Sequence, residues 1–264
     1  MSHISSAPGS RGIPTFALLD QMVTVLGGTK LSFWPFIQAT GTTLSPYGSG
    51  TDGVLLTASS AIESILDPLI HVGGVYSLKN DGTTAWLQSA DDADYSFATG
   101  GFSVGAWVLM EEPLGTVRSV VSKYRSDAAT LREYDFRFTT GGLPVLEIFD
   151  ESVPADWTST CVTNTITPFI WQFVVATYSG TEGASAIVHY LNATAETPTG
   201  VETGLFVAME DTAAPVGIGH RNPATAAQVF VGRIALPFIT GVALTAANVT
   251  TLYGLGRKLL GLAN

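Results

Sequence analysis

Side chains capable of acid–base chemistry are concentrated in one segment of this 264-residue sequence, Glu147-Ile148-Phe149-Asp150-Glu151. Two carboxylates can act as general acid and nucleophile when they lie on the same face of a strand. In a regular strand Glu147 and Asp150 point to opposite faces, whereas Glu147 and Glu151 share a face. The residue between that pair is Phe149, so the shared face lacks an intervening acid.

The remaining candidates for metal binding and nucleophilic chemistry are few and scattered. His71, His189 and His220 lie far apart and lack the short spacing of zinc ligands. Cys161 is the one cysteine, so no internal disulfide can form, and a small buried thiol is favoured over a nucleophile. The run Asp91-Asp92-Ala93-Asp94 can be a calcium loop or a solvated acidic turn, and the second interpretation is favoured. We therefore expect no metal and no cofactor.

Basic residues cluster in the middle of the chain, where five of the 12 lysines and arginines fall within 20 residues. The five are Arg118, Lys123, Arg125, Arg132 and Arg137. They can form a patch for an acidic partner, or they can belong to a mixed, solvated sheet face. The second interpretation is favoured, because Asp127, Glu133 and Asp135 share the segment.

Composition excludes several classes of protein. Hydrophobic residues make up 46% of the chain and charged residues 13%, which excludes intrinsic disorder. The net charge of −10 gives no global basis for binding nucleic acid or an anionic membrane. The most apolar region, Val229–Leu244, is interrupted by Arg233 and Pro237, so we expect no membrane span. The N-terminal residues lack a signal-peptide pattern, which predicts synthesis in a cytoplasm.

Short segments rich in Val, Ile, Phe, Tyr and Thr dominate the chain from Leu31 onward and predict strands. They are Leu31–Phe36, Tyr76–Leu78, Ala85–Gln88, Phe102–Met110, Val117–Tyr124, Tyr134–Thr139, Val145–Asp150, Trp171–Tyr178, Ala186–Leu191, Val216–Gly219 and Val229–Phe238. Apolar and polar residues alternate in several of them, which indicates one buried face and one solvated face. The buried side chains are expected to be Trp34, Phe36, Phe102, Val104, Trp107, Phe136, Phe138, Trp171, Phe173 and Val175.

Helical patterns are short and few. Pro14–Leu26 has apolar residues at helical spacing and ends at a Gly-Gly pair, which predicts one amphipathic helix after an arm at residues 1–13. Ser60 begins a capping-box pattern that ends at Pro68, and Thr245 can cap a helix over residues 246–253. Many strands with little helix predict an all-β fold, an antiparallel sandwich or jelly roll. We expect an arm with a short helix at 1–30, a β domain at 31–253 and a tail at 254–264.

Several segments occur in the order found in a known superfamily. The blocks are Phe33-Trp34-Pro35-Phe36 with Gly41-Thr42-Thr43, Phe102-Ser103-Val104-Gly105-Ala106-Trp107-Val108, Val120-Val121-Ser122-Lys123-Tyr124, Trp171-Gln172-Phe173-Val174-Val175-Ala176-Thr177-Tyr178, and Phe230-Val231-Gly232-Arg233-Ile234 followed by Ala243-Leu244-Thr245 and Leu252-Tyr253. Together they resemble the laminin-G-like, concanavalin A-like lectin/glucanase jelly rolls. The resemblance extends from Leu31 to Tyr253 and implies the antiparallel sandwich.

Two departures from that superfamily bear on chemistry. Related proteins often hold a structural calcium through two acidic residues, and the aligned positions here are Ser45 and Ala235, which implies that this calcium site is absent. Glycosidases on the same scaffold resemble one another in a Glu-x-Asp-x-(x)-Glu strand. Because Phe149 interrupts the corresponding carboxylates, we expect no glycosidase activity and no enzyme.

Two functional hypotheses follow. An unexported jelly roll with an arm resembles bacteriophage virion proteins, which implies a capsid decoration or a head or tail fibre component located in the virion. Such a protein assembles as a homo-oligomer, with a trimer favoured, and binds other virion proteins through an N-terminal helix. The expected interface residues are Phe16, Leu19, Met22, Val23 and Leu26. The alternative is a carbohydrate-binding module for host attachment, in which Trp86, Tyr95 and Trp157 stack on a glycan.

Overall fold

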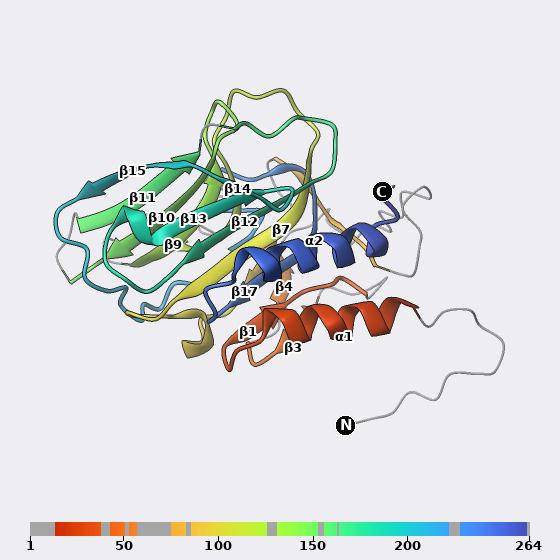
Figure 1. The fold of residues 1–264 in the computed structure, drawn as a ribbon, viewed down its shortest axis with the longest axis horizontal. Helices are drawn as coiled ribbons and strands as arrows, with labels where there is room; N and C mark the ends of the chain where they lie inside the picture. Colours follow the sequence, from red (N-terminus) through yellow and green to blue (C-terminus); the bar gives the residue numbers. More distant parts are fainter. Residues whose placement is uncertain are drawn as a thin grey trace.

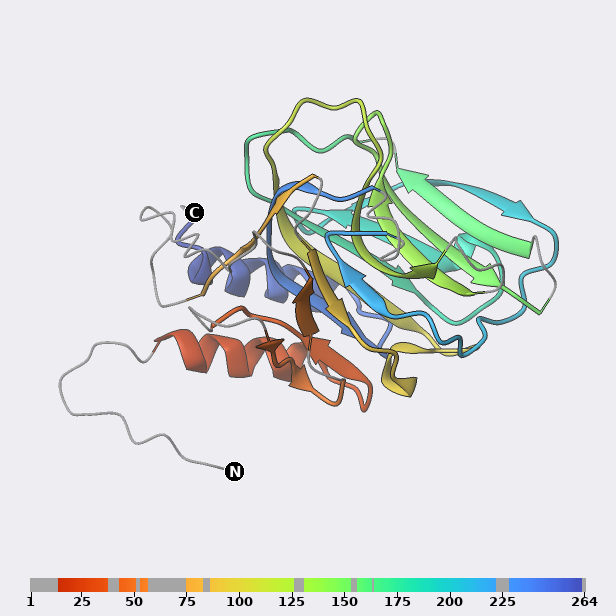
Figure 2. The same ribbon diagram turned by 180° about the vertical axis from the view of Figure 1, so that it is seen from behind.

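A computed structural model of the chain describes residues 14–37, 43–50, 53–56, 75–82, 86–125, 131–152, 156–162, 164–221 and 228–262. The chain forms two antiparallel β-sheets packed face to face, with two α-helices on one flank (Figure 1). The predicted all-β sandwich with an N-terminal helix is therefore confirmed. Figure 2 shows the same arrangement from behind.

Sheet A contains eight strands in the order β14-β13-β12-β7-β17-β1-β3, with β5 also paired to β17. Its strands are β1 (Leu31–Phe33), β3 (Tyr47–Gly48), β5 (Leu78–Asp81), β7 (Phe102–Met110), β12 (Gln172–Tyr178), β13 (Ile187–Leu191), β14 (Thr194–Glu196) and β17 (Val231–Thr240). The three longest of these strands, β7, β12 and β17, lie side by side at its centre.

Sheet B contains nine strands in the order β15-β11-β10-β9-β8-β16-β6-β4-β2. They are β2 (Thr43–Leu44), β4 (Gly53–Leu56), β6 (Trp86–Ser89), β8 (Arg118–Arg125), β9 (Leu131–Phe138), β10 (Pro144–Asp150), β11 (Asp156–Val162), β15 (Pro198–Thr203) and β16 (Val216–Ile218). Two 3₁₀ turns, Ala93–Tyr95 and Ala184–Ala186, lie in the connections. The strand β11 was not expected, because its sequence is rich in Ser and Thr and low in aliphatic residues.

The main core lies between the two sheets. Phe102 and Val104 from sheet A meet Phe136 and Phe138 from sheet B, and all four are fully buried. Of the ten side chains expected inside, nine are buried, while Trp171 is half-buried. Six of the nine lie in this core, whereas Trp107, Phe173 and Val175 lie on the opposite face of sheet A, so the predicted buried set combined two faces that alternation separates.

A second core lies on the outer face of sheet A, beneath helices α1 (Pro14–Leu26) and α2 (Ala246–Leu259). Trp107 and Phe173 point away from the main core and pack in this second cluster. The two helices lie side by side over this flank (Figure 1). The fold therefore has three layers: the two helices cover the outer face of sheet A, and the inner face of sheet A packs on sheet B.

Close packing fixes α2 in place. A side chain at Gly256 would put its Cβ only 2.1 Å from Trp107 Nε1, so this approach requires glycine. Thr245 and Asn248 form a capping box at the start of α2. The helix continues to Leu259, beyond the predicted end at Tyr253, because Leu255 and Leu259 bury their side chains in the second core.

Some predicted features lie outside the described residues, namely the arm at 1–13 and the helical turn between Ser60 and Pro68. The proposed division into arm, domain and tail stays a prediction. In the part of the chain that the structure describes, neither helix is long and apolar enough to cross a membrane.

Candidate binding face on sheet B

The outer face of sheet B carries a polar row across its central strands. Ser122 on β8 is paired in register with Asp135 on β9, and Asp135 is paired with Glu147 on β10. Their chain neighbours Phe136 and Ile148 point into the main core. Because side chains alternate along a strand, the three polar groups share the face that turns away from the core.

Ion pairs hold this row together. Asp135 Oδ2 lies 3.4 Å from Arg137 Nε and 3.4 Å from Arg221 Nε. The other carboxylate oxygen of Asp135 accepts a hydrogen bond from Ser119 Oγ at 2.8 Å. Arg137 Nη2 donates to Glu147 Oε1 at 2.5 Å. Each charge in the row thus has an opposite charge beside it, which offsets the cost of burying it.

The guanidinium groups also stack on aromatic rings. The Arg221 guanidinium carbon lies 3.9 Å from the centroid of the Tyr124 ring, and that of Arg132 lies 4.8 Å from Phe149. Tyr124 and Phe149 contact each other edge to face at 5.4 Å. Trp157, half-buried on β11, is paired in register with Phe149. We call this surface the arginine–aromatic face; it comprises Tyr124, Arg132, Asp135, Arg137, Glu147, Phe149, Trp157 and Arg221.

Partial exposure makes this face available to a ligand. The side chain of Asp135 is fully buried, whereas those of Arg137 and Glu147 keep 16% and 13% of their surface exposed. Burial raises the pKa of Glu147, and Arg137 lowers it in opposition. The face therefore presents the tips of charged groups whose positions are already fixed.

A stacked pair continues this side of the sheet at β6. Trp86 lies parallel to His220, with ring centroids 4.4 Å apart and an interplanar angle of 15°. Both side chains are buried. Burial lowers the pKa of His220 to about 4, so the ring is neutral at pH 7.

The carboxylates of the predicted acidic strand point where alternation placed them. Glu147 lies on the arginine–aromatic face, while Asp150 accepts hydrogen bonds from the backbone N–H groups of Val207 and Ala208. Burial raises the pKa of Asp150, but hydrogen bonds from Ser152, Val207 and Ala208 outweigh it and lower the pKa overall. Glu151 pairs with Arg132. Glu147, Asp150 and Glu151 therefore each have different partners and do not form one carboxylate pair.

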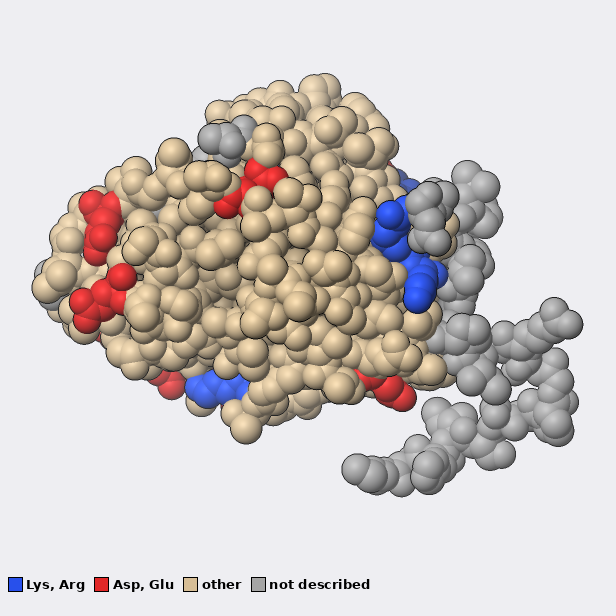
Figure 3. Space-filling view, viewed as in Figure 1, with Lys and Arg blue, Asp and Glu red and all other residues tan. Residues whose placement is uncertain are grey.

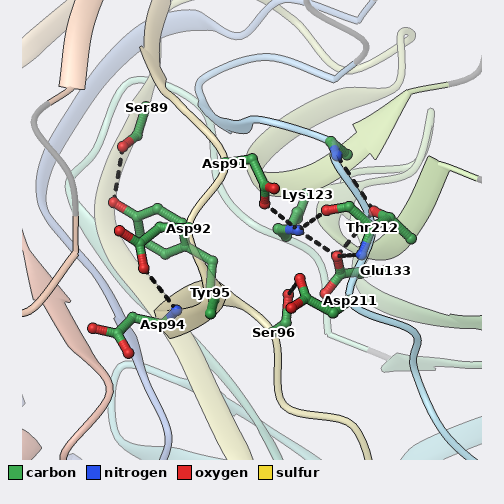
Figure 4. A network of polar contacts seen from close by, with 12 residues as sticks. Ser89, Asp91, Asp92, Asp94, Tyr95, Ser96, Lys123, Glu133, Asp211 and Thr212 are labelled. Carbon is green, nitrogen blue, oxygen red and sulfur yellow. Dashed lines mark hydrogen bonds and ion pairs between the residues drawn. The ribbon is translucent and has the colours of Figure 1, made fainter.

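The acidic run at 91–94 is not a simple solvated turn, because one of its carboxylates meets an internal cation. Lys123 Nζ lies 2.9 Å from Asp91 Oδ1, contacts Glu133 and donates to the backbone oxygen of Thr212 at 2.5 Å (Figure 4). Asp92 instead accepts a hydrogen bond from the backbone N–H of Asp94 at 2.9 Å. Among the described residues, no three His, Cys, Asp or Glu side chains form a metal-binding group.

The basic segment is correspondingly more buried than the sequence predicts. Lys123 and Glu133 are both fully buried, in contrast to the solvated face expected for this segment. Lys123 pairs with Tyr134, whose side chain lies in the main core, so alternation turns Lys123 away from the face of Ser122. The pairing then shifts register and leaves Glu133 as the extra residue of a bulge. Burial raises the pKa of Glu133, although Lys123 lowers it in opposition.

Two of the three predicted glycan contacts lie in the interior. Tyr95 is fully buried, where its hydroxyl hydrogen-bonds Ser89 at 2.8 Å and its ring stacks on Trp34. Trp86 is buried against His220. These rings therefore present no open stacking surface, whereas Trp157 does remain partly exposed.

The predicted interface residues of the N-terminal helix divide in the same way. Leu19, Met22 and Leu26 are fully buried in the second core of this chain, and Val23 packs against that core. Only Phe16 is exposed, at 56%. The apolar stripe covers the chain's own sheet A, so it is not free to bind a neighbouring subunit in this structure.

Of the two positions aligned with calcium ligands, Ala235 lies in sheet A, whereas Ser45 lies between β2 of sheet B and β3 of sheet A. Ala235 is buried in β17, and Ser45 follows β2 beside a small cavity lined by Trp34 and Tyr47. The backbone of Cys161 lies in β11. His71 lies outside the described residues.

Comparisons with known proteins agree with this architecture. A family model described as the concanavalin A-like lectin/glucanases superfamily matches residues 81–250. A search of curated proteins found no match.

Several solved structures share the fold at low sequence identity. A variant of Trypanosoma rangeli sialidase is 12% identical, with a TM-score of 0.59, over 93% of this chain and 38% of that one. The binding domain of botulinum neurotoxin serotype C1 is 11% identical, with a TM-score of 0.58, over 88% of this chain and 53% of that one. The receptor-binding domain of the type G neurotoxin is 13% identical, with a TM-score of 0.52, over 87% and 52%. The chain thus spans about a third to a half of these proteins.

Proposed function

We propose that this chain, which belongs to the concanavalin A-like lectin/glucanase superfamily, is a non-catalytic glycan-binding protein that uses the arginine–aromatic face. The observation that carries the proposal is the fixed row of Asp135, Arg137 and Glu147 beside the half-buried Trp157. Glycans need this combination, since their hydroxyl groups bind charged donors and acceptors while their ring faces stack on aromatics.

Preorganisation supports binding over catalysis. Arg137 is already held by Asp135 and Glu147, so a ligand does not bear the full cost of ordering it. The same ion pairs keep Glu147 occupied, and Phe149 stands between Glu147 and Glu151 where an acid would complete a hydrolytic pair. The face therefore suits recognition.

One structural neighbour supports the same ligand class, since it is a Trypanosoma rangeli sialidase in complex with sialic acid. The arginines of the arginine–aromatic face are balanced by carboxylates, so both neutral and acidic glycans belong in the test.

A glycan array probed with the full chain tests this proposal. Arg137→Gln and Trp157→Ala should each weaken binding to the best glycan by about tenfold or more, which corresponds to about 1.4 kcal/mol. Arg233→Gln is the matched control, because Arg233 is paired with Glu111 and lies on sheet A with similar exposure, 18%. Equal losses in all three variants, or no glycan bound at all, would contradict the proposal. Release of sugar from the bound glycan would contradict its non-catalytic part.

A second candidate function is assembly, which the edge of sheet B favours. Val201 on β15, with Leu205 and Val207 after it, is exposed at 57%, 65% and 46% respectively. Exposed apolar groups on a strand at the end of a sheet favour self-association. In this proposal the chain is a virion component, a capsid decoration or fibre subunit, that forms a homo-oligomer, with a trimer favoured.

Native mass spectrometry tests the assembly proposal. An oligomer that dissociates in Val201→Lys but persists in Thr199→Lys is the expected result. A monomer at high micromolar concentration would overturn it without affecting the glycan proposal. Presence of the chain in purified virions is a separate requirement of the virion part.

A further inference from the structure

A second cavity lies on the opposite side of the molecule, between the end of α2 and the outer face of sheet A. Its volume is about 460 Å³, within the range of small-molecule sites. It is lined by residues of β7, the 169–171 segment before β12, and α2. The residues that matter here are Trp107, Phe169, Ile170, Trp171, Tyr253 and Arg257.

Aromatic side chains form one wall of this cavity: Tyr253 and Trp171 are half-buried at its surface, and the buried Trp107 lies behind Tyr253. Trp107 and Tyr253 are stacked, with centroids 5.3 Å apart and an interplanar angle of 10°. Trp107 is held rigidly, since it packs against Gly256. A surface of this kind suits a planar apolar ring, because stacking adds to the burial of apolar area.

A positive charge without a carboxylate partner lies beside these rings. Five arginines in the described ranges form ion pairs with carboxylates: Arg118, Arg132, Arg137, Arg221 and Arg233. Arg257 has no such partner among the described residues, and its guanidinium carbon lies 5.5 Å from the Tyr253 ring. Figure 3 shows basic atoms beside the end of α2 on a largely uncharged surface. An arginine stays charged at any ordinary pH, so this wall favours an anion.

The segment before β12 exposes apolar side chains in a strained conformation. Phe169 is 62% exposed and Ile170 is 51% exposed. Phe169 has φ = 66°, which is unfavourable for a bulky residue, and its N–H donates to Met110 O at 2.8 Å. These exposed side chains do not pack in the core, and the strained backbone does not stabilise the fold. Exposed apolar side chains and backbone strain are both typical of segments that contact ligands.

We propose that this cavity binds a small molecule with a planar apolar ring system and one anionic group, a carboxylate or sulfonate. The ring packs against the half-buried Tyr253 and Trp171, the anion pairs with Arg257, and Phe169 with Ile170 closes over the exposed edge. This site is separate from the arginine–aromatic face, so the two proposals stand or fall independently.

Titration of the full chain with naphthalene-2-carboxylate, followed by tryptophan fluorescence and calorimetry, tests the proposal. Arg257→Gln should weaken binding by about tenfold or more. The matched control is Lys258→Gln, which removes the same charge one residue along from an exposed side chain that does not line the cavity. Naphthalene-2-methanol, which lacks the charge, should bind the parent chain about as weakly as the carboxylate binds Arg257→Gln.

Three results would overturn the proposal. The first is no binding of the carboxylate at millimolar concentration by a chain with unchanged circular dichroism. The second is an equal loss of affinity in Arg257→Gln and Lys258→Gln. The third is sedimentation with anionic phosphatidylserine vesicles without binding of the soluble carboxylate, which would make the surface a membrane contact.

Discussion

On the outer face of sheet A, Trp107, Phe173 and Val175 lie beneath α1 and α2, whereas the outer face of sheet B carries Ser122, Asp135 and Glu147 at its centre. Both sheets alternate side chains in the same way, so the difference comes from the residue types on the second face. Apolar residues there required helices to cover them, and polar residues required ion pairs. One face therefore became core, and the other became a surface with prearranged charged groups.

The largest expected effect is a difference in stability between variants on the covered face of sheet A and variants on the open face of sheet B. Trp107→Ala should lower the free energy of unfolding by about 3–5 kcal/mol, because it empties space under α2. Trp157→Ala, on the partly exposed face of sheet B, should cost about 1 kcal/mol. Urea denaturation of both variants measures the difference, and equal losses would remove the distinction between covered and open faces.

Acidification should destabilise the chain through two buried histidines. Burial lowers the pKa of His189 and of His220 from 6.5 to about 4 in the folded state. The unfolded chain then binds protons that the folded chain does not, so stability falls as pH drops from 6.5 towards 4. The loss reaches about 3 kcal/mol for each histidine. The raised pKa values of Glu133 and Glu147 act in the opposite direction as pH falls.

Thermal melting between pH 7 and pH 4 measures this slope. His189→Gln should flatten it, because the neutral amide can keep a hydrogen bond to Thr160 but does not titrate. An unchanged slope in both His189→Gln and His220→Gln would show that other groups govern the acid response.

The helix layer should contribute a smaller, local effect. Met22→Ala should lower the free energy of unfolding by about 2 kcal/mol. Met22 is fully buried between α1 and sheet A, and a surface helix can relax around the lost volume. Phe16→Ala is the control on the same helix, and its exposed side chain predicts a change within about 0.5 kcal/mol. If Phe16→Ala proved the more damaging in a monomer, the packing of α1 on sheet A would be refuted.

The smallest effect concerns the polar row itself. Ser119→Ala removes the hydrogen bond to Asp135 Oδ1 and should cost about 1 kcal/mol of stability. It should also weaken glycan binding a few-fold, because Asp135 then holds Arg137 less rigidly. Chemical denaturation and the glycan titration measure the two effects, and tighter glycan binding would argue against preorganisation.

Alternation along the strands allowed the sandwich, the main core and the facing of Glu147 and Asp150 to be predicted from sequence. Two features could not be predicted from the sequence, because they depend on contacts between distant segments. Arg221 reaches Asp135 only because β16 pairs with β8, and Trp86 is buried because β6 lies between β16 and β4 with His220 stacked on it. The placement of Tyr95 failed for a related reason, since the turn residues around it suggested a rim while Trp34 covers its ring.

The indole N–H signals of the five tryptophans test the central claim most directly, because Trp34, Trp86, Trp107, Trp157 and Trp171 sample both faces. Two-dimensional ¹H–¹⁵N spectra should be recorded while the best glycan from the array is added. The Trp157 signal should shift to saturation, while those of Trp34 and Trp107 stay in place. A glycan that shifts Trp107 and Trp171 and leaves Trp157 unmoved would place the binding site on sheet A and contradict the assignment to the arginine–aromatic face.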